Sequence, residues 1–245
     1  MAAVRSEWIK LRTARSSVVL LVLAVFGPIA LTVLVCFAAS KNDIEGENLM
    51  SLVLAGANLG SILIGVLGVL VIGQEYRHNT IRVTFTSEPR RLRVLGAKML
   101  TIAVTALLAG AVAAGLSYVI GNAILTSRGL DITIEGTTQL RALVGVVVLY
   151  GLYALAGLGV GAIIRATAGA ITLLVVWPVI IEPIIGALIS STHKYLPFIA
   201  ASALVDTDQP RPDDLFSPWV GALWFAGFVA LLLVIGSVLV SRRDA

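Results

Sequence analysis

Residues that could perform acid–base or nucleophilic chemistry are few in this chain of 245 residues. His193 follows Ser190, Ser191 and Thr192, but neighbouring residues rarely align as a nucleophile and its base, and no acid is placed to orient the imidazole. The second histidine, His78, is separated from His193 by three long apolar runs, and the chain has one cysteine. A phosphate-binding Gly-x-x-x-x-Gly-Lys-Ser/Thr motif is absent from the sequence. The sequence therefore predicts a protein that is not an enzyme and that binds no metal.

Glu182 is the acid that lies deepest in an apolar stretch, and Pro183 follows it. An ionisable group in such a stretch is costly and is usually functional or paired. In one interpretation, Glu182 faces a substrate path and contacts the substrate or a proton. In the other, it lies at the outer end of a shortened membrane span, as part of an outer gate near water. About 21 Å of helix separates Ala168 from Glu182, less than the roughly 30 Å of the hydrocarbon core, which favours the outer position.

A charged segment from Gly73 to Lys98 separates two long apolar runs. Its hydrophobic residues alternate first with polar residues and then recur at helical spacing, which predicts one or two short amphipathic pieces. A polybasic loop held on anionic lipid is the alternative, but it does not explain Glu75, Tyr76 and Thr80 where the chain leaves the membrane. The segment contains six basic residues: Arg77, Arg82, Arg90, Arg91, Arg93 and Lys98.

The composition places these residues on a membrane protein. Hydrophobic residues make up 58% of the chain, charged residues 13%, and the mean hydropathy is +0.97, whereas soluble domains contain about 25% charged residues. We expect an all-α, polytopic single domain over residues 1–245. The predicted spans cover about residues 18–39, 49–72, 98–120, 140–164, 168–190 and 219–240, with a loop over 73–97 and another over 191–217.

The distribution of basic residues predicts the orientation of these spans. If the amino terminus is cytoplasmic, 13 of the 18 lysines and arginines lie in cytoplasmic segments. Lys and Arg are enriched in the short cytoplasmic loops of membrane proteins. Six spans with both termini inside fit this pattern, whereas an odd number would place Arg242 and Arg243 outside.

The amino-terminal segment, residues 1–17, is polar and basic. Val4, Trp8 and Leu11 recur at helical spacing, which predicts an amphipathic helix lying in the membrane interface. Trp8 suits the headgroup level, because its ring is apolar and its N–H is polar. The alternative is the basic start of a signal peptide, but the apolar run that follows is longer than such peptides use.

Two small-residue motifs predict close helix packing in the spans. They are Gly56-x-x-x-Gly60 in the second span and Gly157-x-x-x-Gly161 in the fourth. Glycines at this spacing let two helix backbones approach closely. Glycine is also common in membrane helices in general, so the motif alone leaves both interpretations open.

Two segments carry a resemblance to a known family. Arg-Ser-Glu-Trp-Ile-Lys-Leu-Arg (residues 5–12) and Gly-x-Glu-Tyr-Arg-x-x-Thr-Ile-Arg (residues 73–82), with six spans, resemble the permease subunit of a type-two ATP-binding-cassette (ABC) exporter, especially the short permeases of actinobacteria. The family commonly has Gly where this chain has Asn79, which can adopt the same positive-φ backbone.

The resemblance implies how the chain obtains energy. In the family, the loop between spans two and three holds a coupling helix that docks on a separate cytoplasmic ATPase subunit, where ATP and Mg²⁺ bind. Residues 4–11 would then form an interfacial helix beside that subunit. Six spans are half a transporter, so a second permease copy or a paralogue is implied. The residues at or next to the ATPase contact would be Glu75, Tyr76, Arg77, Thr80, Ile81 and Arg82.

These observations favour a non-catalytic permease in a bacterial plasma membrane, with lipid around it and no nucleic-acid partner. Apolar spans with few aromatic residues are compatible with export of a hydrophobic drug, a lipid or a peptide. One alternative is an ion- or proton-driven secondary carrier that uses Glu182, although proton relays usually need more than one intramembrane charge. Another alternative is a membrane scaffold that transports nothing.

Overall fold

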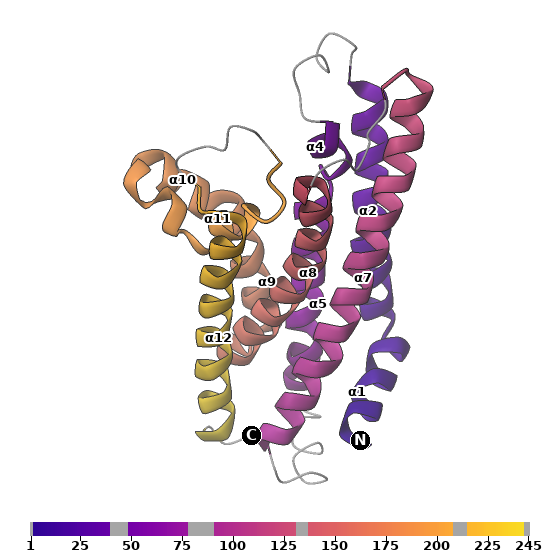
Figure 1. Ribbon diagram of the computed structural model, residues 1–245. Helices are drawn as coiled ribbons and strands as arrows, with labels where there is room; N and C mark the ends of the chain where they lie inside the picture. Colours follow the sequence, from indigo (N-terminus) through magenta and orange to yellow (C-terminus); the bar gives the residue numbers. More distant parts are fainter. Residues whose placement is uncertain (1, 40–48, 78–90, 131–136, 208–214, 243–245) are drawn as a thin grey trace.

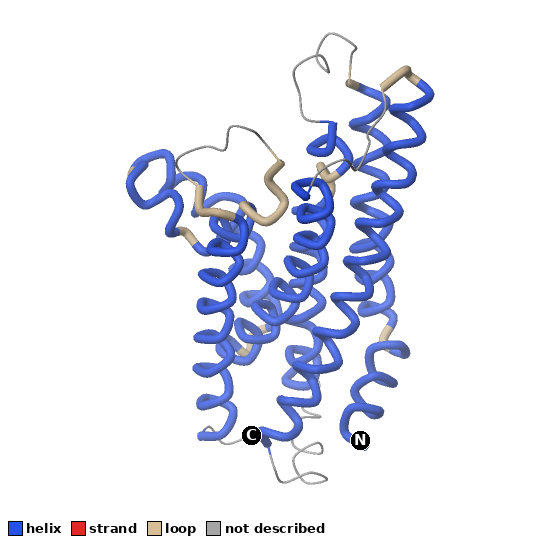
Figure 2. The backbone as a smooth tube through the Cα atoms, in the orientation of Figure 1, coloured by secondary structure: helices blue, strands red, loops and turns tan. Residues whose placement is uncertain are grey.

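Long helices dominate the computed structural model, which describes residues 2–39, 49–77, 91–130, 137–207 and 215–242 (Figures 1 and 2). Within these residues, six helical segments are long and apolar enough to cross a membrane. They confirm the predicted all-α fold with six candidate spans. The segments are Arg15–Ala38, Leu49–Tyr76, Leu92–Ser127, Thr137–Ile164, Thr167–Leu188 and Pro218–Arg242.

The helices pack around α8, which contacts α5, α7, α9 and α12. Helix α1 lies at the end of the bundle that also holds both chain termini, and we call this the α1 end (Figure 1). Helices α4, α10 and α11 lie at the opposite, far end (Figure 1). The elements are α1 (Ala2–Thr13), α2 (Arg15–Ala38), α4 (Leu49–Val53), α5 (Ala57–Arg77), α7 (Arg91–Ser127), α8 (Thr137–Ile164), α9 (Thr167–Val176), the π-helical turn η1 (Trp177–Ile181), α10 (Glu182–Leu188), the 3₁₀ turn η2 (Ser190–Tyr195), α11 (Pro197–Ser202) and α12 (Pro218–Arg242).

Helices α5 and α8 touch through their backbones. A methyl group added to Gly157 would lie 1.9 Å from the carbonyl oxygen of Gly65, and one added to Gly68 would lie 2.1 Å from that of Ala154. One added to Gly161 would lie 2.8 Å from Ile72 Cγ2. In lipid, the hydrophobic effect does not drive helices together. Small residues let the two backbones approach closely, and this packing stabilises the contact. The contact fixes the axis of α5, whose last turn carries the residues of the candidate site.

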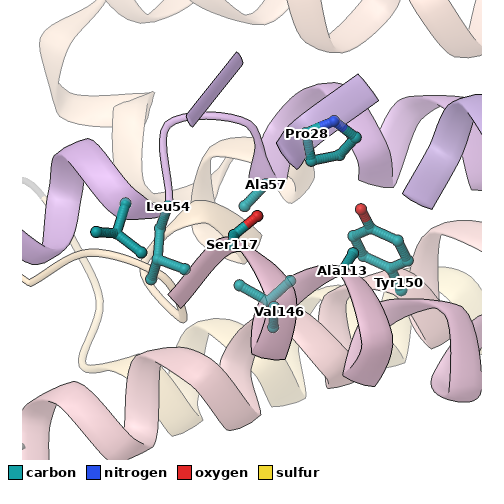
Figure 3. Close-up of a pocket in the computed structure, with 9 residues that line it drawn as sticks. Pro28, Leu54, Ala57, Ala113, Ser117, Val146 and Tyr150 are labelled. Atoms are coloured by element: carbon teal, nitrogen blue, oxygen red, sulfur yellow. The ribbon is translucent and has the colours of Figure 1, made fainter. Parts of the chain in front are cut away.

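A proline inside α2 is compensated by a tyrosine from α8. Pro28 has no N–H, so the carbonyl of Ala24, four residues earlier, loses its helical partner. The Tyr150 hydroxyl donates a hydrogen bond to that oxygen at 2.9 Å, passing over Gly60, where a methyl group would lie 1.7 Å from the hydroxyl. Figure 3 shows Tyr150 pointing towards Pro28, beside a cavity of about 10 Å³ that Ser117 also lines. This explains how Gly-Pro is accommodated within a span.

Replacing Tyr150 by phenylalanine is expected to lower the free energy of unfolding by about 1–2 kcal/mol, because the buried Ala24 carbonyl loses its donor. Unfolding in mixed micelles with increasing SDS would measure the change. Tyr195→Phe, at a half-exposed ring, is the matched control and should change little. An equal effect in both variants would contradict this role of the hydroxyl.

The sequence suggested one continuous helix for the second span, but the structure divides this span into two helices. Helix α4 ends at Val53, and α5 begins at Ala57. The turn between them lies against α2, since a methyl group on Gly56 would lie 2.4 Å from Pro28 Cα. Thr32 Oγ1 donates to the carbonyl of Val53 at 2.8 Å. Irregular backbone within a span needs such partners, because lipid offers none.

Several boundaries also differ from the predicted ones. Helix α7 begins seven residues before the predicted third span and ends seven residues after it. Its 37 residues correspond to roughly 55 Å, well beyond a hydrocarbon core of roughly 30 Å. The predicted loop over 73–97 is shorter, because α5 continues to Arg77 and α7 starts at Arg91. The predicted loop over 191–217 contains η2 and α11.

Candidate functional site

Four charged residues from three helices meet at the α1 end. Lys98 of α7 donates hydrogen bonds to Glu75 Oε1 of α5 at 2.8 Å and to Glu7 Oε2 of α1 at 2.6 Å. Lys10, also on α1, donates to Glu7 Oε1 at 2.7 Å and to Glu75 Oε1 at 2.6 Å. We call Glu7, Lys10, Glu75 and Lys98 the ion-pair cluster. It ties α1 and α7 to the last turn of α5.

Three of the four residues of the ion-pair cluster are buried, about half of the Lys10 side chain is exposed, and the charges are balanced. Glu7, Glu75 and Lys98 are 5%, 6% and 2% exposed. Removing such groups from water is costly unless each charge has a partner, and here two carboxylates face two ammonium groups. Burial acts to lower the pKa of Lys10, but its hydrogen bonds to Glu7 and Glu75 outweigh this and raise the pKa above its ordinary value. Lys10 therefore remains a cation at every physiological pH.

Glu7 and Lys10 were not recognised from the sequence as members of a site. The helical spacing of Val4, Trp8 and Leu11 indicated an apolar face, but Glu7 shares the inward face of α1 with Val4 and Leu11. Trp8 is 39% exposed, and the Arg12 guanidinium lies over its ring at 5.9 Å. Lys98 could have been the signal, because a lysine at the edge of an apolar run must reach water or pair with an anion.

The same α5 turn is also held by Arg165, between α8 and α9, and by Thr167, the first residue of α9. The guanidinium carbon of Arg165 lies 5.0 Å from the centre of the Tyr76 ring. The Thr167 hydroxyl donates to the carbonyl of Gly73 at 3.1 Å. Residues 73–76 are therefore fixed by the ion-pair cluster and by these two residues.

The structure describes only part of the predicted ATPase contact. It places Glu75 in the ion-pair cluster and Tyr76 against Arg165. Arg77 is the last residue of α5. The remaining predicted residues, Thr80, Ile81 and Arg82, lie outside the described residues, as does His78.

Glu182 is fully buried within the protein, at 0% exposure. Its carboxylate accepts hydrogen bonds from the backbone N–H groups of Phe198 at 3.2 Å and Ile199 at 2.9 Å, and from Trp177 Nε1 at 2.9 Å. These amides belong to the first turn of α11, which has no side-chain cap of its own. Because the first amides of a helix lack helical partners, a carboxylate placed there stabilises the helix.

The other end of α11 is held by a cation from α8. Arg141 Nη1 donates to the carbonyl oxygens of Leu204 at 3.0 Å and Ala203 at 3.3 Å, and Nη2 donates to that of Asp206 at 2.5 Å. An acid at the amino end and a base at the carboxyl end both match the helix dipole. Helix α11 also lies close to α12, since a methyl group on Gly221 would lie 2.2 Å from the carbonyl oxygen of Ala200. Helix α11 therefore joins α8, α10 and α12 at the far end.

Replacing Glu182 by alanine is expected to loosen α11, because three donors, one buried and two partly buried, lose their acceptor. We expect a loss of about 2 kcal/mol in the free energy of unfolding, within the range for hydrogen bonds to a charged group. Hydrogen exchange of the amides in Pro197–Ser202 should rise, while exchange in α5 should not. Unchanged exchange in α11 would contradict the capping role.

Among the described residues, no group of three or more His, Cys, Asp and Glu side chains could hold a metal ion. Six candidate membrane helices define the class as a multi-pass membrane protein. Residues 3–186, about three quarters of the chain, match the model of the family described as ABC-2 family transporter protein. The chain therefore belongs to the ABC-2 transporter family and is a membrane permease component, a non-catalytic transport subunit without a cofactor of its own. A search of curated proteins found no match.

Proposed function

We propose that this chain is the permease subunit of an ABC exporter that is driven by separate cytoplasmic ATPase subunits. ATP and Mg²⁺ would bind to those partners. The region around residues 73–98, including Glu75, Tyr76, Arg77, Thr80, Ile81 and Arg82, would receive the ATPase movement. Two permease copies, or this chain and a paralogue, would form the substrate path in a bacterial, actinobacterial-like plasma membrane.

The observation that carries this proposal is the ion-pair cluster. It joins the two helices that border residues 78–90, α5 and α7, and adds α1 to them. A force applied between α5 and α7 would therefore reach three helices together. ATP can drive such a change only if the ATPase favours one permease state over another.

The distribution of basic residues supports a cytoplasmic α1 end. The segments at both termini, the central segment and Arg165 contain 13 of the 18 lysines and arginines. With Lys and Arg enriched on the cytoplasmic side, both termini and the ion-pair cluster would face the ATPase. Helix α1 would lie in the interface, with Trp8 towards the headgroups and Glu7 towards the protein.

For the substrate, we propose a hydrophobic drug, a lipid or a peptide, moved outward. Large apolar side chains are exposed along α2 and α12, as expected of surfaces that face lipid or a second permease. Glu182 would support an outer gate by holding α11. A proton-carrying role is disfavoured, because its carboxylate already accepts three hydrogen bonds.

Disulfide cross-linking tests the proposed ATPase contact. Single cysteines at Thr80 or Arg82 would be introduced into a Cys36→Ala background, with cysteines placed across the surface of a co-expressed ATPase subunit. We expect cross-links that depend on bound nucleotide. Leu188→Cys, on the exposed far end of α10, is the matched control and should give none. The proposal fails if residues 78–90 give no cross-link at any position while the ATPase co-purifies.

A further inference from the structure

The residue between α8 and α9 adopts a backbone conformation that suits glycine. Arg165 has φ 60°, and it is the non-glycine residue with positive φ in the described part of the chain. It follows Ile164, the last residue of α8, at the position where a helix commonly ends with a left-handed glycine. A side chain at this position brings a conformational cost that glycine would avoid. The side chain of Arg165 is therefore expected to make a contact that offsets this cost.

The contact that the structure gives to this side chain is the ring of Tyr76. The guanidinium carbon lies 5.0 Å from the ring centre, within the range of a cation–π interaction. Its Nε is buried and has no hydrogen-bond partner within the described residues. The position of the guanidinium thus follows from the aromatic ring rather than from a hydrogen bond at Nε.

The backbone around Arg165 is otherwise well ordered by hydrogen bonds. Its N–H donates to Gly161 at 3.1 Å, and the Ala166 N–H donates to Ile164 at 2.7 Å. Two residues further on, the Thr167 hydroxyl reaches Gly73 in the same turn of α5. The α8–α9 connection therefore holds a short, fixed shape against residues 73–76.

We propose that Arg165 is a positioning residue, which fixes Tyr76 and transmits movement of the last turn of α5 to α9. The second part of this proposal, the transmission of movement to α9, rests on the proposed function. Helix α9 continues through η1 into α10, whose first residue, Glu182, holds α11. Movement at the α1 end would thereby reach the far end through one continuous helical segment. The ion-pair cluster also contacts this turn, but it connects the turn to α1 and α7.

The first experiment uses the permease alone. In R165G the relief of strain at φ 60° offsets the lost cation–π contact, so the unfolding midpoint should change little. Hydrogen exchange of the Gly73–Tyr76 amides should become about fivefold faster, the factor expected for loss of one cation–π contact. R165K keeps a cation and should restore most of the protection. Arg242→Ala, which removes a basic residue from the same end, should leave exchange unchanged.

The second experiment uses the complex with its ATPase subunit. Bimane would be attached at Leu188→Cys in a Cys36→Ala background, and its fluorescence compared with and without ATP. In R165G we expect the ATPase to remain bound and to hydrolyse ATP, while the fluorescence response falls at least fivefold.

The outcomes separate the two proposals. Unchanged exchange at residues 73–76 in R165G, or equal exchange in R165G and R165K, overturns the positioning role. A full ATP response at Leu188 in R165G, or none in the wild type with ATPase bound, overturns the transmission. If the wild type retains no ATPase, the proposed function fails, while the exchange experiment still decides the positioning role.

Discussion

Replacing Lys98 by methionine is expected to lower the free energy of unfolding by about 3–5 kcal/mol, the usual cost of removing one partner from a buried ion pair. Lys98 is 2% exposed and bonds to both carboxylates of the ion-pair cluster. Without it, Glu7 and Glu75 share Lys10 alone, and one buried negative charge is left without a partner. Unfolding by steric trapping in bicelles would measure the loss.

A second replacement should recover much of this stability. In Lys98→Met with Glu75→Met, the remaining Glu7 and Lys10 are again balanced in charge, so we expect the double variant to be more stable than Lys98→Met alone. Arg15→Met, which removes an exposed cation at the start of α2, is the matched control and should stay within about 0.5 kcal/mol of the wild type. Additive losses from the two cluster replacements would argue against a coupled cluster.

Replacing Gly157 by alanine is expected to separate α5 from α8 and to lower the free energy of unfolding by about 3 kcal/mol, at the upper end of the usual range for overpacking. The added methyl group would lie 1.9 Å from the carbonyl oxygen of Gly65. Backbone atoms cannot move aside as a flexible side chain does, so one helix must shift. SDS-induced unfolding would measure the loss.

Gly115 supplies the matched control for this replacement. It lies in α7, and an added methyl group would meet no atom within 4 Å. Gly115→Ala should therefore raise stability slightly, by up to about 1 kcal/mol, because alanine has the higher helix propensity. Equal destabilisation of both variants would show that the α5–α8 contact is not the cause.

The number of spans could be predicted from the sequence because it depends on one-dimensional quantities. Long apolar runs must form helices in lipid, and the charged segments between them mark where the chain leaves it. The interruption of the second span at residues 54–56 could not be predicted from such apolar runs and charged segments. It depends on Thr32 of another helix, which satisfies the carbonyl of Val53, and such a partner is visible only in three dimensions.

The candidate site was predicted in part, for a related reason. Glu75 and Tyr76 stand in a recognisable segment, but their partners Lys10 and Arg165 are 65 and 89 positions away in the chain. Glu182 was seen to be unusual, because a charge within an apolar run always is. Its role depends on the amides of α11, and backbone donors leave no pattern in a sequence.

The ion-pair cluster also has a consequence for how the protein is made. Its four members belong to the first 98 residues and to α1, α5 and α7. During synthesis, these three helices are made before α8, which follows them in the chain. Glu75 therefore meets Lys98, its second ammonium partner, as soon as α7 is in place, and the four charges of the ion-pair cluster can balance before α8 is added. The remaining spans would then pack against the first three spans, which the ion-pair cluster already holds together at the α1 end.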